Sequence, residues 1–277
     1  MSEEGGGKSL SRMESKIKRS IKGAARRLFP APLKGLLFWG AFSVMTESER
    51  DGLRKILQMA SVEWSLRNIK SLGFRPRQII DVGAYVGGWA RMAKSIFPEA
   101  EVLMIEAQQG KEAELRRVCA EYPGEVAYRM SLLGAEERDG VEFYELETGS
   151  SVLFEQSSIE REKVRYPMRA LDAVAAEAGF SEAGLLKLDV QGYELEVLKG
   201  APRLLLSAEV ILMEVSLLGV NRGAPLLHEV LGFMSERGFR TYDVCSFIRR
   251  PLDNALWQSD FLFVKETSPL LNDQSFD

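Results

Sequence analysis

The sequence predicts one doubly wound α/β domain that follows a basic N-terminal extension. From residue 77 onward, short apolar runs alternate with segments that repeat their apolar residues at helical spacing. Residues 210–215 are almost wholly apolar, as expected of a central strand that helices cover on both faces. The last two strand-like runs, 240–244 and 261–265, have no helix between them, so we expect them to pair antiparallel. With 45% hydrophobic residues in 277, the chain can bury one sizeable core.

We assign residues 1–50 to the extension and residues 51–277 to the domain. The first 34 residues contain nine basic and three acidic side chains, a net charge of +6, which leaves −10 for the rest of the chain. Glycines at 5–7 indicate disorder, and the pattern from about residue 10 to Pro30 favours a helix. The apolar run at 33–45 is shorter than the roughly 20 residues that span a bilayer.

Two interpretations of the extension stay open. In the first, its basic face lies against anionic lipid headgroups with Phe38 and Trp39 at the interface, which gives a cytoplasmic protein peripheral to the membrane. In the second, a solvated helix is followed by a segment that packs on the domain.

The domain is predicted to begin with a helix at 49–72 and a strand at 78–82. The strand runs directly into a turn that contains glycine, and a helix follows at 87–97. Its apolar residues fall at i, i+3, i+4, i+7 and i+8: Trp89, Met92, Ala93, Ile96 and Phe97. Pro98 ends this helix. We then expect strands at 101–106 and 126–131 on either side of a helix at 111–121.

The pattern is less regular in the middle of the chain. Strand-like runs at 141–146 and 164–168 flank a turn at 148–151, and a helix is expected at 171–178. Regular alternation returns with a strand at 185–190, a helix from about Tyr193, the apolar strand at 210–215 and a helix at 226–237. The two final strands complete the domain.

Composition excludes several classes of protein. An acidic body argues against nucleic-acid binding, because such proteins carry positive charge across their folded surface. Cys119 and Cys245 lie far apart with no CxxC spacing, which gives no sign of a structural zinc site or an oxidising compartment. A single histidine, His228, excludes a histidine-rich metal centre. No Gly-x-Ser-x-Gly motif of a serine hydrolase occurs.

The turn after the first strand has the character of a ligand-binding loop. It reads DVGAYVG from Asp81 to Gly87, and glycine there allows close approach of the backbone to a ligand. A dinucleotide fingerprint has a further glycine where Tyr85 stands, and an acid such as Asp81 repels a pyrophosphate but suits a cationic ligand with an amine and a sulfonium. Glu106, at the end of the second strand, is placed to accept both hydroxyls of a ribose. Together these residues favour S-adenosylmethionine over NAD.

In these motifs, the sequence resembles the FkbM-type methyltransferases, a branch of the class I S-adenosylmethionine-dependent enzymes. The resemblance rests on DVGAYVGGWA, then IEA, then LLKLDVQGYELEVLKGA, and it extends over residues 77–265. It implies a Rossmann-like sheet of seven strands with the last strand antiparallel, and methyl transfer to a hydroxyl. It places the cofactor motif on Asp81, Gly83 and Gly87 and the ribose acid on Glu106. The chain departs from many relatives at Ala107, where they have proline.

We therefore predict a cofactor site formed by the loop, the second strand end and the residues beside them. Its members are Asp81, Gly83, Ala84, Tyr85, Gly87, Glu106, Ala107, Ser131 and Asp189.

Methyl transfer to an alcohol is helped by a group that accepts the proton, and Asp189 is our first candidate. Asp189 ends a strand at the edge where open α/β sheets bind ligands, and the alternative is a cap or an ion pair with Lys187 or Lys199. Glu214 lies within an apolar strand and needs a partner, either Lys187 or the substrate. Glu194 is expected to be a first-turn acid that the helix dipole favours.

Other candidates have weaker support. His228 lies beside an apolar helical stripe and has either a structural or a catalytic role. Ser150, Ser151 and Asp260 either line the acceptor site or serve as turn and cap residues. Asp189 with Glu214 could hold magnesium, but the adjacent Asp-Asn pair of catechol-type enzymes is absent, so we predict no metal.

The predicted function is S-adenosylmethionine-dependent O-methyl transfer to a hydroxyl of a small molecule or glycan. No Asp/Asn-Pro-Pro-aromatic motif follows the strand at 185–190, which argues against methylation of nucleic-acid bases. Two alternatives stay open: an NAD-dependent oxidoreductase, and a catalytically inactive cofactor-binding scaffold at the membrane surface. The sequence indicates no particular oligomeric state.

Overall fold

The computed structural model describes residues 45–46, 49, 61–146, 149–154, 161–273 and 275. The chain divides into two compact units, Met1–Met59 and Ala60–Asp277. In the first unit, the carboxylate of Glu49 accepts hydrogen bonds from the amide and the hydroxyl of Thr46. The predicted basic helix and the apolar run at 33–45 lie outside the described residues, as does most of the first half of the helix predicted at 49–72.

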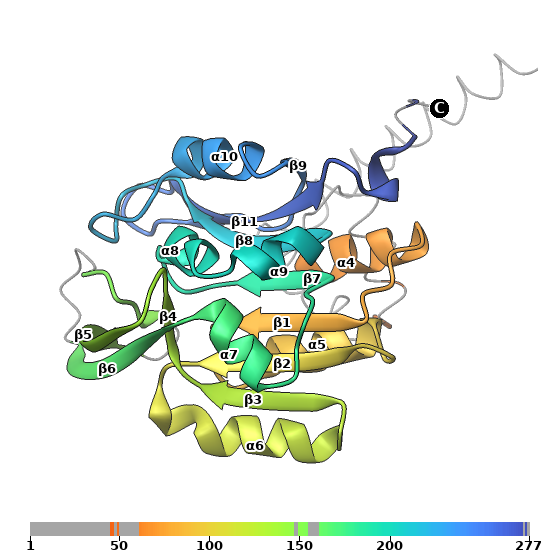
Figure 1. The fold of residues 1–277 in the computed structure, drawn as a ribbon. Coiled ribbons are helices and arrows are strands. Elements are labelled where there is room, and N and C mark those ends of the chain that lie inside the picture. Colours follow the sequence, from red (N-terminus) through yellow and green to blue (C-terminus); the bar gives the residue numbers. More distant parts are fainter. Residues whose placement is uncertain are drawn as a thin grey trace, which may run out of the picture. The chain divides into compact units, whose positions relative to one another are not determined.

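The second unit is built on a large, mostly parallel sheet (Figure 1). Its strands are β1 (Gln78–Val82), β2 (Glu101–Glu106), β3 (Val126–Met130), β7 (Leu185–Leu188), β8 (Val210–Ser216), β9 (Phe239–Val244), β10 (Ile248–Arg249) and β11 (Leu256–Lys265). The order is β3-β2-β1-β7-β8-β11, with β9 and the two-residue β10 both pairing with β11. β11 runs antiparallel to β8 and to β9, so the prediction that the last two strands pair antiparallel is confirmed. Seven strands match the predicted sheet, and β10 is an addition.

Helices cover both faces of this sheet because alternate strand residues point to opposite sides. One hydrophobic cluster joins Ile79 and Val102 to α4 (Val62–Ser71), α5 (Gly88–Ile96) and α6 (Glu112–Glu121). The other joins Ile80 and Leu103 to α7 (Leu171–Glu177), α8 (Glu194–Lys199), α9 (Pro202–Ser207) and α10 (Leu227–Ser235). Single-turn 3₁₀ helices lie at Gln109–Lys111 and Pro269–Leu271. The doubly wound α/β prediction is therefore confirmed.

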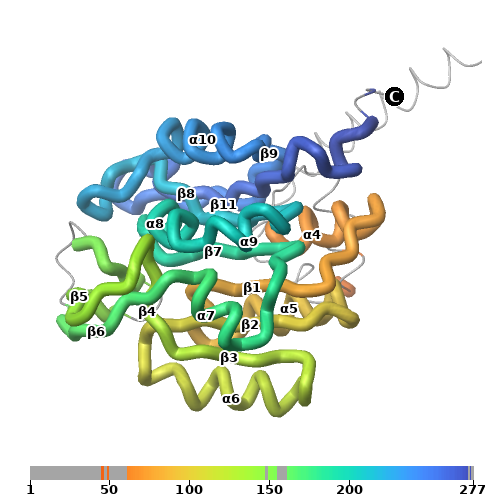
Figure 2. The backbone as a smooth tube through the Cα atoms, in the orientation of Figure 1, coloured from red at the N-terminus to blue at the C-terminus, as the bar shows by residue number. Residues whose placement is uncertain are grey.

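A second, three-stranded sheet accounts for the irregular middle of the sequence. Figure 2 follows the chain from β3 into β4 (Leu132–Gly134) and on to β5 (Arg138–Glu145) and β6 (Glu162–Ala170). β6 lies between the other two strands, parallel to β4 and antiparallel to β5. Because β3 leads into β4 through Ser131 alone, this sheet starts at the carboxyl end of the main sheet.

The strand order reverses between β1 and β7. β1 pairs in parallel with β2 on one side and with β7 on the other, and the chain reaches β2 and β7 by crossovers on opposite faces of the sheet. In open α/β sheets, the crevice outside the carboxyl ends of two such strands is the usual ligand site.

Candidate functional site

A cavity of about 250 Å³ lies at that crevice. Its walls come from the ends of β1, β2 and β7, the turns that follow them, and β4 and β5 of the small sheet. Eight of the residues predicted for the cofactor or acceptor line it: Gly83, Ala84, Tyr85, Glu106, Ala107, Ser131, Ser150 and Asp189. The structure thus brings the loop at 83–88 and the turn at 189–193 together around one cavity.

Three residues of the first turn, Gly83, Tyr85 and Gly87, have left-handed backbone, for different reasons. Gly83 has φ 74°, and a Cβ atom there would lie 1.9 Å from the carbonyl oxygen of Asp189, so only glycine fits. Tyr85, which stands where a dinucleotide fingerprint has glycine, has φ 51° and so takes up the conformation that glycine would. The loop therefore keeps its shape without the second glycine.

Gly87 has a structural reason of its own. A Cβ atom at this position would lie 2.6 Å from Cγ2 of Val118, and the residue caps α5 with φ 74°. It is not among the residues that line the cavity. Gly87 allows α5 to start close to α6.

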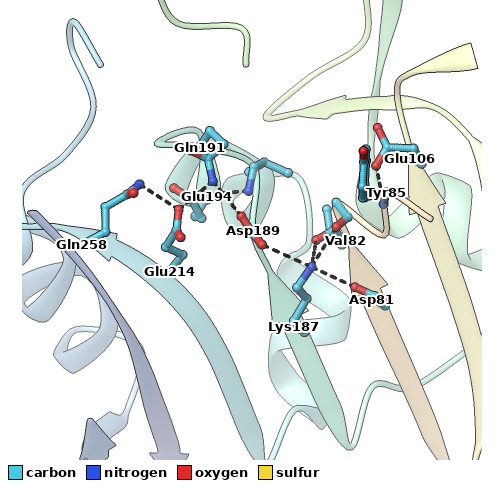
Figure 3. Close-up of polar contacts among 12 residues, drawn as sticks. Asp81, Val82, Tyr85, Glu106, Lys187, Asp189, Gln191, Glu194, Glu214 and Gln258 are labelled. Carbon is cyan, nitrogen blue, oxygen red and sulfur yellow. Dashed lines mark hydrogen bonds and ion pairs between the residues drawn. The ribbon is translucent and has the colours of Figure 1, made fainter. Parts of the chain in front are cut away.

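Glu106 ties the two cofactor-side loops together. Its Oε2 accepts the amide of Tyr85 at 2.7 Å (Figure 3), and its Oε1 accepts the amides of Ala107 and Gln108, each at 2.9 Å. A carboxylate has about four acceptor positions, so three are used and one is left. Both ribose hydroxyls would share this carboxylate with the three amides, and their recognition by Glu106 stays a prediction. Burial raises the pKa of Glu106, and the three amides oppose that shift.

Lys187 is a buried cation at the centre of the site (Figure 3). Its Nζ lies 3.0 Å from Oδ1 of Asp81 and donates to the carbonyl oxygens of Val82 at 3.2 Å and Gly83 at 2.8 Å. It also lies 3.7 Å from Oδ2 of Asp189. Burial alone would lower the pKa of Lys187, but the carboxylates of Asp81 and Asp189 outweigh it and raise the pKa, so the ammonium stays charged. Lys187 therefore holds the end of β1 against the turn after β7.

Asp81 is fully buried beneath the loop and does not line the cavity. Burial raises its pKa, and the ion pair with Lys187 opposes that shift. Asp81 therefore contributes to the cofactor site indirectly, because it pairs with Lys187, which in turn holds the glycine loop.

Asp189 is the carboxylate that the cavity exposes. Its side chain is 39% exposed, whereas the other lining acid, Glu106, is buried. Its Oδ1 accepts a hydrogen bond from Nε2 of Gln191 at 3.0 Å. Of the two predicted cation partners Lys187 is the one present, since Lys199 pairs with Glu196 on α8.

Within the protein, Glu214 contacts two side-chain amides and not Lys187, and its contact with substrate stays a prediction. Its Oε1 accepts Nε2 of Gln191 at 2.7 Å and Nε2 of Gln258 at 2.8 Å (Figure 3). Burial, together with the nearby carboxylates of Asp189, Glu194 and Asp260, raises the pKa of Glu214 to about 9. The group is therefore a neutral carboxylic acid at pH 7.

Glu194 holds the turn between β7 and α8. Its Oε1 accepts the amides of Val190 at 2.9 Å and Gly192 at 3.1 Å, and its side chain is buried. Burial raises its pKa to about 7, against these hydrogen bonds. Glu194 lies in the first turn of α8, as predicted, and in addition it binds the two amides of the preceding turn.

Three of the remaining candidates, His228, Asp260 and Ser151, do not line the cavity. His228 is exposed on α10, and Asp260 is the cross-strand neighbour of Glu214 on β11, where burial raises its pKa. Ser151 is buried and donates to the carbonyl oxygen of Gln191 at 3.0 Å, so its place is behind the turn. Ser150 lines the cavity while its hydroxyl accepts the amide of Leu146.

Gln191 and Gln258 were not predicted as partners of Glu214. Gln191 is close in sequence to Asp189, but its bond to Glu214 spans 23 positions and that of Gln258 spans 44. Gln258 stands beside Ser259 and Asp260, so its own sequence gave no signal of this contact. Within the described residues, no cluster of three or more histidine, cysteine or acidic side chains is arranged to hold a metal ion.

Comparison with known proteins identifies a family. Residues 81–241, more than half of the chain, match the family model described as the methyltransferase FkbM domain. No protein of curated function matches the sequence significantly.

Solved structures resemble the chain only distantly. Precorrin-6y C5,15-methyltransferase from Geobacter metallireducens GS-15 is 9% identical with a TM-score of 0.41, covering 75% of this chain and 91% of that one. Magnesium protoporphyrin IX methyltransferase from Synechocystis PCC 6803, with bound SAM, is 10% identical with a TM-score of 0.42, covering 74% and 76%. The fibrillarin pre-rRNA processing protein of Methanococcus jannaschii is 13% identical with a TM-score of 0.44, covering 70% and 68%. Likenesses of this size carry no weight for activity or substrate.

Proposed function

This chain belongs to the FkbM methyltransferase family, and we propose that it transfers the methyl group of S-adenosylmethionine to a hydroxyl oxygen of a small molecule or glycan. It is an S-adenosylmethionine-dependent methyltransferase, which replaces the alternative of an NAD-dependent oxidoreductase. The observation that carries the hydroxyl proposal is the Asp189 carboxylate, exposed in the cavity beside the glycine loop. A hydroxyl acceptor must lose a proton, and a carboxylate at this point can accept it.

The residues of the cavity fit the methyl donor. Gly83 and Tyr85 give the loop a conformation in which its backbone borders the cavity, and Glu106 keeps one acceptor position for a ribose hydroxyl. Lys187 also lines the cavity, but its ammonium is paired with Asp81 and donates to the carbonyl oxygens of Val82 and Gly83. Its charge is therefore compensated by protein groups, which reduces its repulsion of a cationic ligand. When bound, S-adenosylmethionine supplies an electrophilic methyl group.

Asp189 then has two tasks. Its Oδ1 is held by Gln191, and its Oδ2, which lies 3.7 Å from Nζ of Lys187, can accept a hydrogen bond from the acceptor hydroxyl and so orient the oxygen. The transfer forms an oxygen–carbon bond and breaks the carbon–sulfur bond of the donor, and Asp189 takes the hydroxyl proton. His228 and a metal ion have no place in this proposal.

The acceptor side of the cavity combines polar and apolar walls. Leu132, Phe143 and Val152 come from the small sheet and the segment after β5, whereas Asp189 and Gln191 face them from the turn after β7. Such a surface suits a compact molecule with a hydroxyl on an apolar or sugar framework. An acidic body and acidic site residues disfavour a nucleic acid.

Transfer of tritium-labelled methyl from S-adenosylmethionine to a cell extract tests the proposal. We expect a labelled small molecule or glycan whose methyl group is bonded to oxygen, and on the order of 100-fold less label with Asp189→Asn, which keeps the shape but cannot take the proton. Calorimetry with S-adenosylhomocysteine shows whether that variant still binds the cofactor product. A label on nitrogen, or undiminished transfer by Asp189→Asn, would overturn the hydroxyl assignment. Cofactor binding without any transfer by the wild type would support an inactive scaffold instead.

We further propose that the basic extension contacts anionic membranes. The charge of +6 on residues 1–34, against −10 in the rest of the chain, supports this. Within the described residues, no helix is both long and apolar enough to cross a bilayer. Full-length protein should float with vesicles of phosphatidylserine and phosphatidylcholine, and less so when the six bases of residues 16–27 become glutamine. Equal flotation of the two proteins would remove this role.

A further inference from the structure

Gln191 has a backbone conformation that is unfavourable for a residue other than glycine. It lies in the turn after β7 with φ 55°, a left-handed conformation that costs a residue other than glycine about 1 kcal/mol. Its carbonyl oxygen accepts hydrogen bonds from Oγ of Ser151 at 3.0 Å and from Nδ2 of Asn221 at 2.8 Å. Both of these side chains are buried, and they come from different segments of the chain. Two independent anchors therefore keep Gln191 in this conformation.

The side chain of Gln191 is held as firmly as its backbone. Its Nε2 lies 3.0 Å from Oδ1 of Asp189 and 2.7 Å from Oε1 of Glu214 (Figure 3). A carboxamide nitrogen carries two hydrogens, so both are used. The reversed carboxamide would place its oxygen against the carboxylate of Asp189, which disfavours that orientation.

The far end of this chain of hydrogen bonds is fixed to the sheet. Oε1 of Glu214 on β8 also accepts Nε2 of Gln258, a residue of β11 that is 3% exposed. The contacts thus run from β11 through Glu214 and Gln191 to Asp189. Each donor in the series is a neutral amide and each acceptor is a carboxyl oxygen.

We propose that Gln191 is a positioning residue, whose carboxamide fixes the carboxylate of Asp189 so that one of its oxygens faces the acceptor hydroxyl. This inference rests on the role proposed above for Asp189. It assigns to Gln191 a function in orientation and none in proton transfer, because an amide neither takes nor gives a proton at neutral pH. It also explains why a strained residue sits at this point of the turn.

Two single variants test the proposal in the tritium-transfer assay with cell extract as the acceptor source. Gln191→Glu keeps the shape but replaces the donor with an acceptor, and Gln191→Asn keeps the amide on a chain too short to reach both partners. We expect each to lower the rate at saturating S-adenosylmethionine on the order of 100-fold, as a displaced reacting group does. The KM for S-adenosylmethionine and the Kd for S-adenosylhomocysteine should stay within about twofold, since the cofactor loop is untouched. A full rate with Gln191→Asn, or a parallel loss of cofactor affinity, would contradict the proposal.

A double variant separates positioning from simple structural support. In Gln191→Glu with Glu214→Gln, the amide of position 214 can donate to position 191 and still accept from Gln258, so the link between β8 and the turn is remade. Asp189, however, then faces a carboxylate. We expect the double variant to regain the Tm that Gln191→Glu loses but not its rate, with Glu214→Gln alone as the control. Recovery of Tm and rate together would show that Gln191 only braces the fold, and would overturn the inference.

These results can be told apart from a failure of the proposed function. If the wild type labels a nitrogen, the hydroxyl proposal fails whatever the Gln191 variants do. If the wild type labels a hydroxyl and the double variant is fully active, the hydroxyl proposal stands and the positioning role is lost.

Discussion

At the scale of single residues, one ammonium group contacts both loops of the site. Lys187 pairs with Asp81 at 3.0 Å, binds the carbonyl oxygens of Val82 and Gly83, and approaches Asp189. The pair with Asp81 is buried, and removing one member of such a pair leaves the other charge without compensation. Lys187 is therefore a residue whose loss should affect stability and ligand binding together.

We expect Lys187→Met to lower the free energy of unfolding by about 3 kcal/mol and to weaken binding of S-adenosylhomocysteine, because the glycine loop loses its donor. Urea denaturation and calorimetry measure the two effects. The matched control is the double variant Asp81→Asn, Lys187→Met, which removes both charges and should be more stable than Lys187→Met alone. If the two substitutions destabilise additively, the buried pair is not what holds the loop.

At the scale of elements, the small sheet differs from the main one in the size of its core. Its own buried hydrophobic cluster consists of Leu132, Phe143 and Met168, and Leu133 of β4 packs into the core of the main sheet, which has a large hydrophobic cluster on each face. Segments with little buried apolar surface open at lower free energy than the global unfolding. Since β4 and β5 also line the cavity, opening of this sheet would expose the ligand site.

Hydrogen exchange should therefore be faster in β5 and β6 than in β1 and β7. Saturation with S-adenosylhomocysteine should slow exchange in β4 and β5, which border the cavity, by more than it slows exchange in β9. Mass spectrometry of peptide fragments measures both. Uniform protection of the two sheets would show that they open as one unit.

The sequence predicted the elements of the main sheet well because their signals are local. Glycine after β1, Pro98 after α5 and the apolar run of β8 each mark an element in their own residues. The sequence did not predict β4 and β10, because strands of two or three residues are too short to show an alternation of apolar and polar residues. It did not predict α9 either, whose one signal was Pro202 at the first helical position.

The site residues likewise divide into those that the sequence could predict and those that it could not. The glycine loop and Asp189 could be predicted because motifs and strand ends place them. The occupied positions of Glu106 and the partners of Glu214 could not, because they depend on which turns meet in space.

At the scale of the whole molecule, burial raises the pKa of several acidic side chains in and beside the site. Burial raises the pKa of Glu214 to about 9 and that of Glu194 to about 7, and it also raises those of Asp81, Glu106 and Asp260. A group with a raised pKa binds its proton more tightly in the folded state than in the unfolded one. Between the two pKa values the unfolded chain has lost the proton and the folded chain has kept it, so stability falls as the pH rises.

We expect the free energy of unfolding to fall between pH 6 and pH 8, by on the order of 1 kcal/mol per pH unit for each such proton. Glu214→Gln mimics the protonated acid and can accept the same two hydrogen bonds, so it should flatten this slope and be more stable than the wild type at pH 8. Denaturation at a series of pH values measures the difference. An unchanged slope in the variant would mean that Glu214 is ionised in the folded protein.

The close approach of Gly83 to the carbonyl oxygen of Asp189 also limits which substitutions position 83 can accept during evolution. A side chain at position 83 is barred while the turn after β7 stays where it is, and that turn is fixed by Glu194, Ser151 and Asn221. Tolerance at one position is thus set by residues more than 60 positions away. Epistasis of this kind predicts that a library randomised at position 83 alone yields glycine among its functional survivors. Alanine should emerge only where the distant turn varies with it.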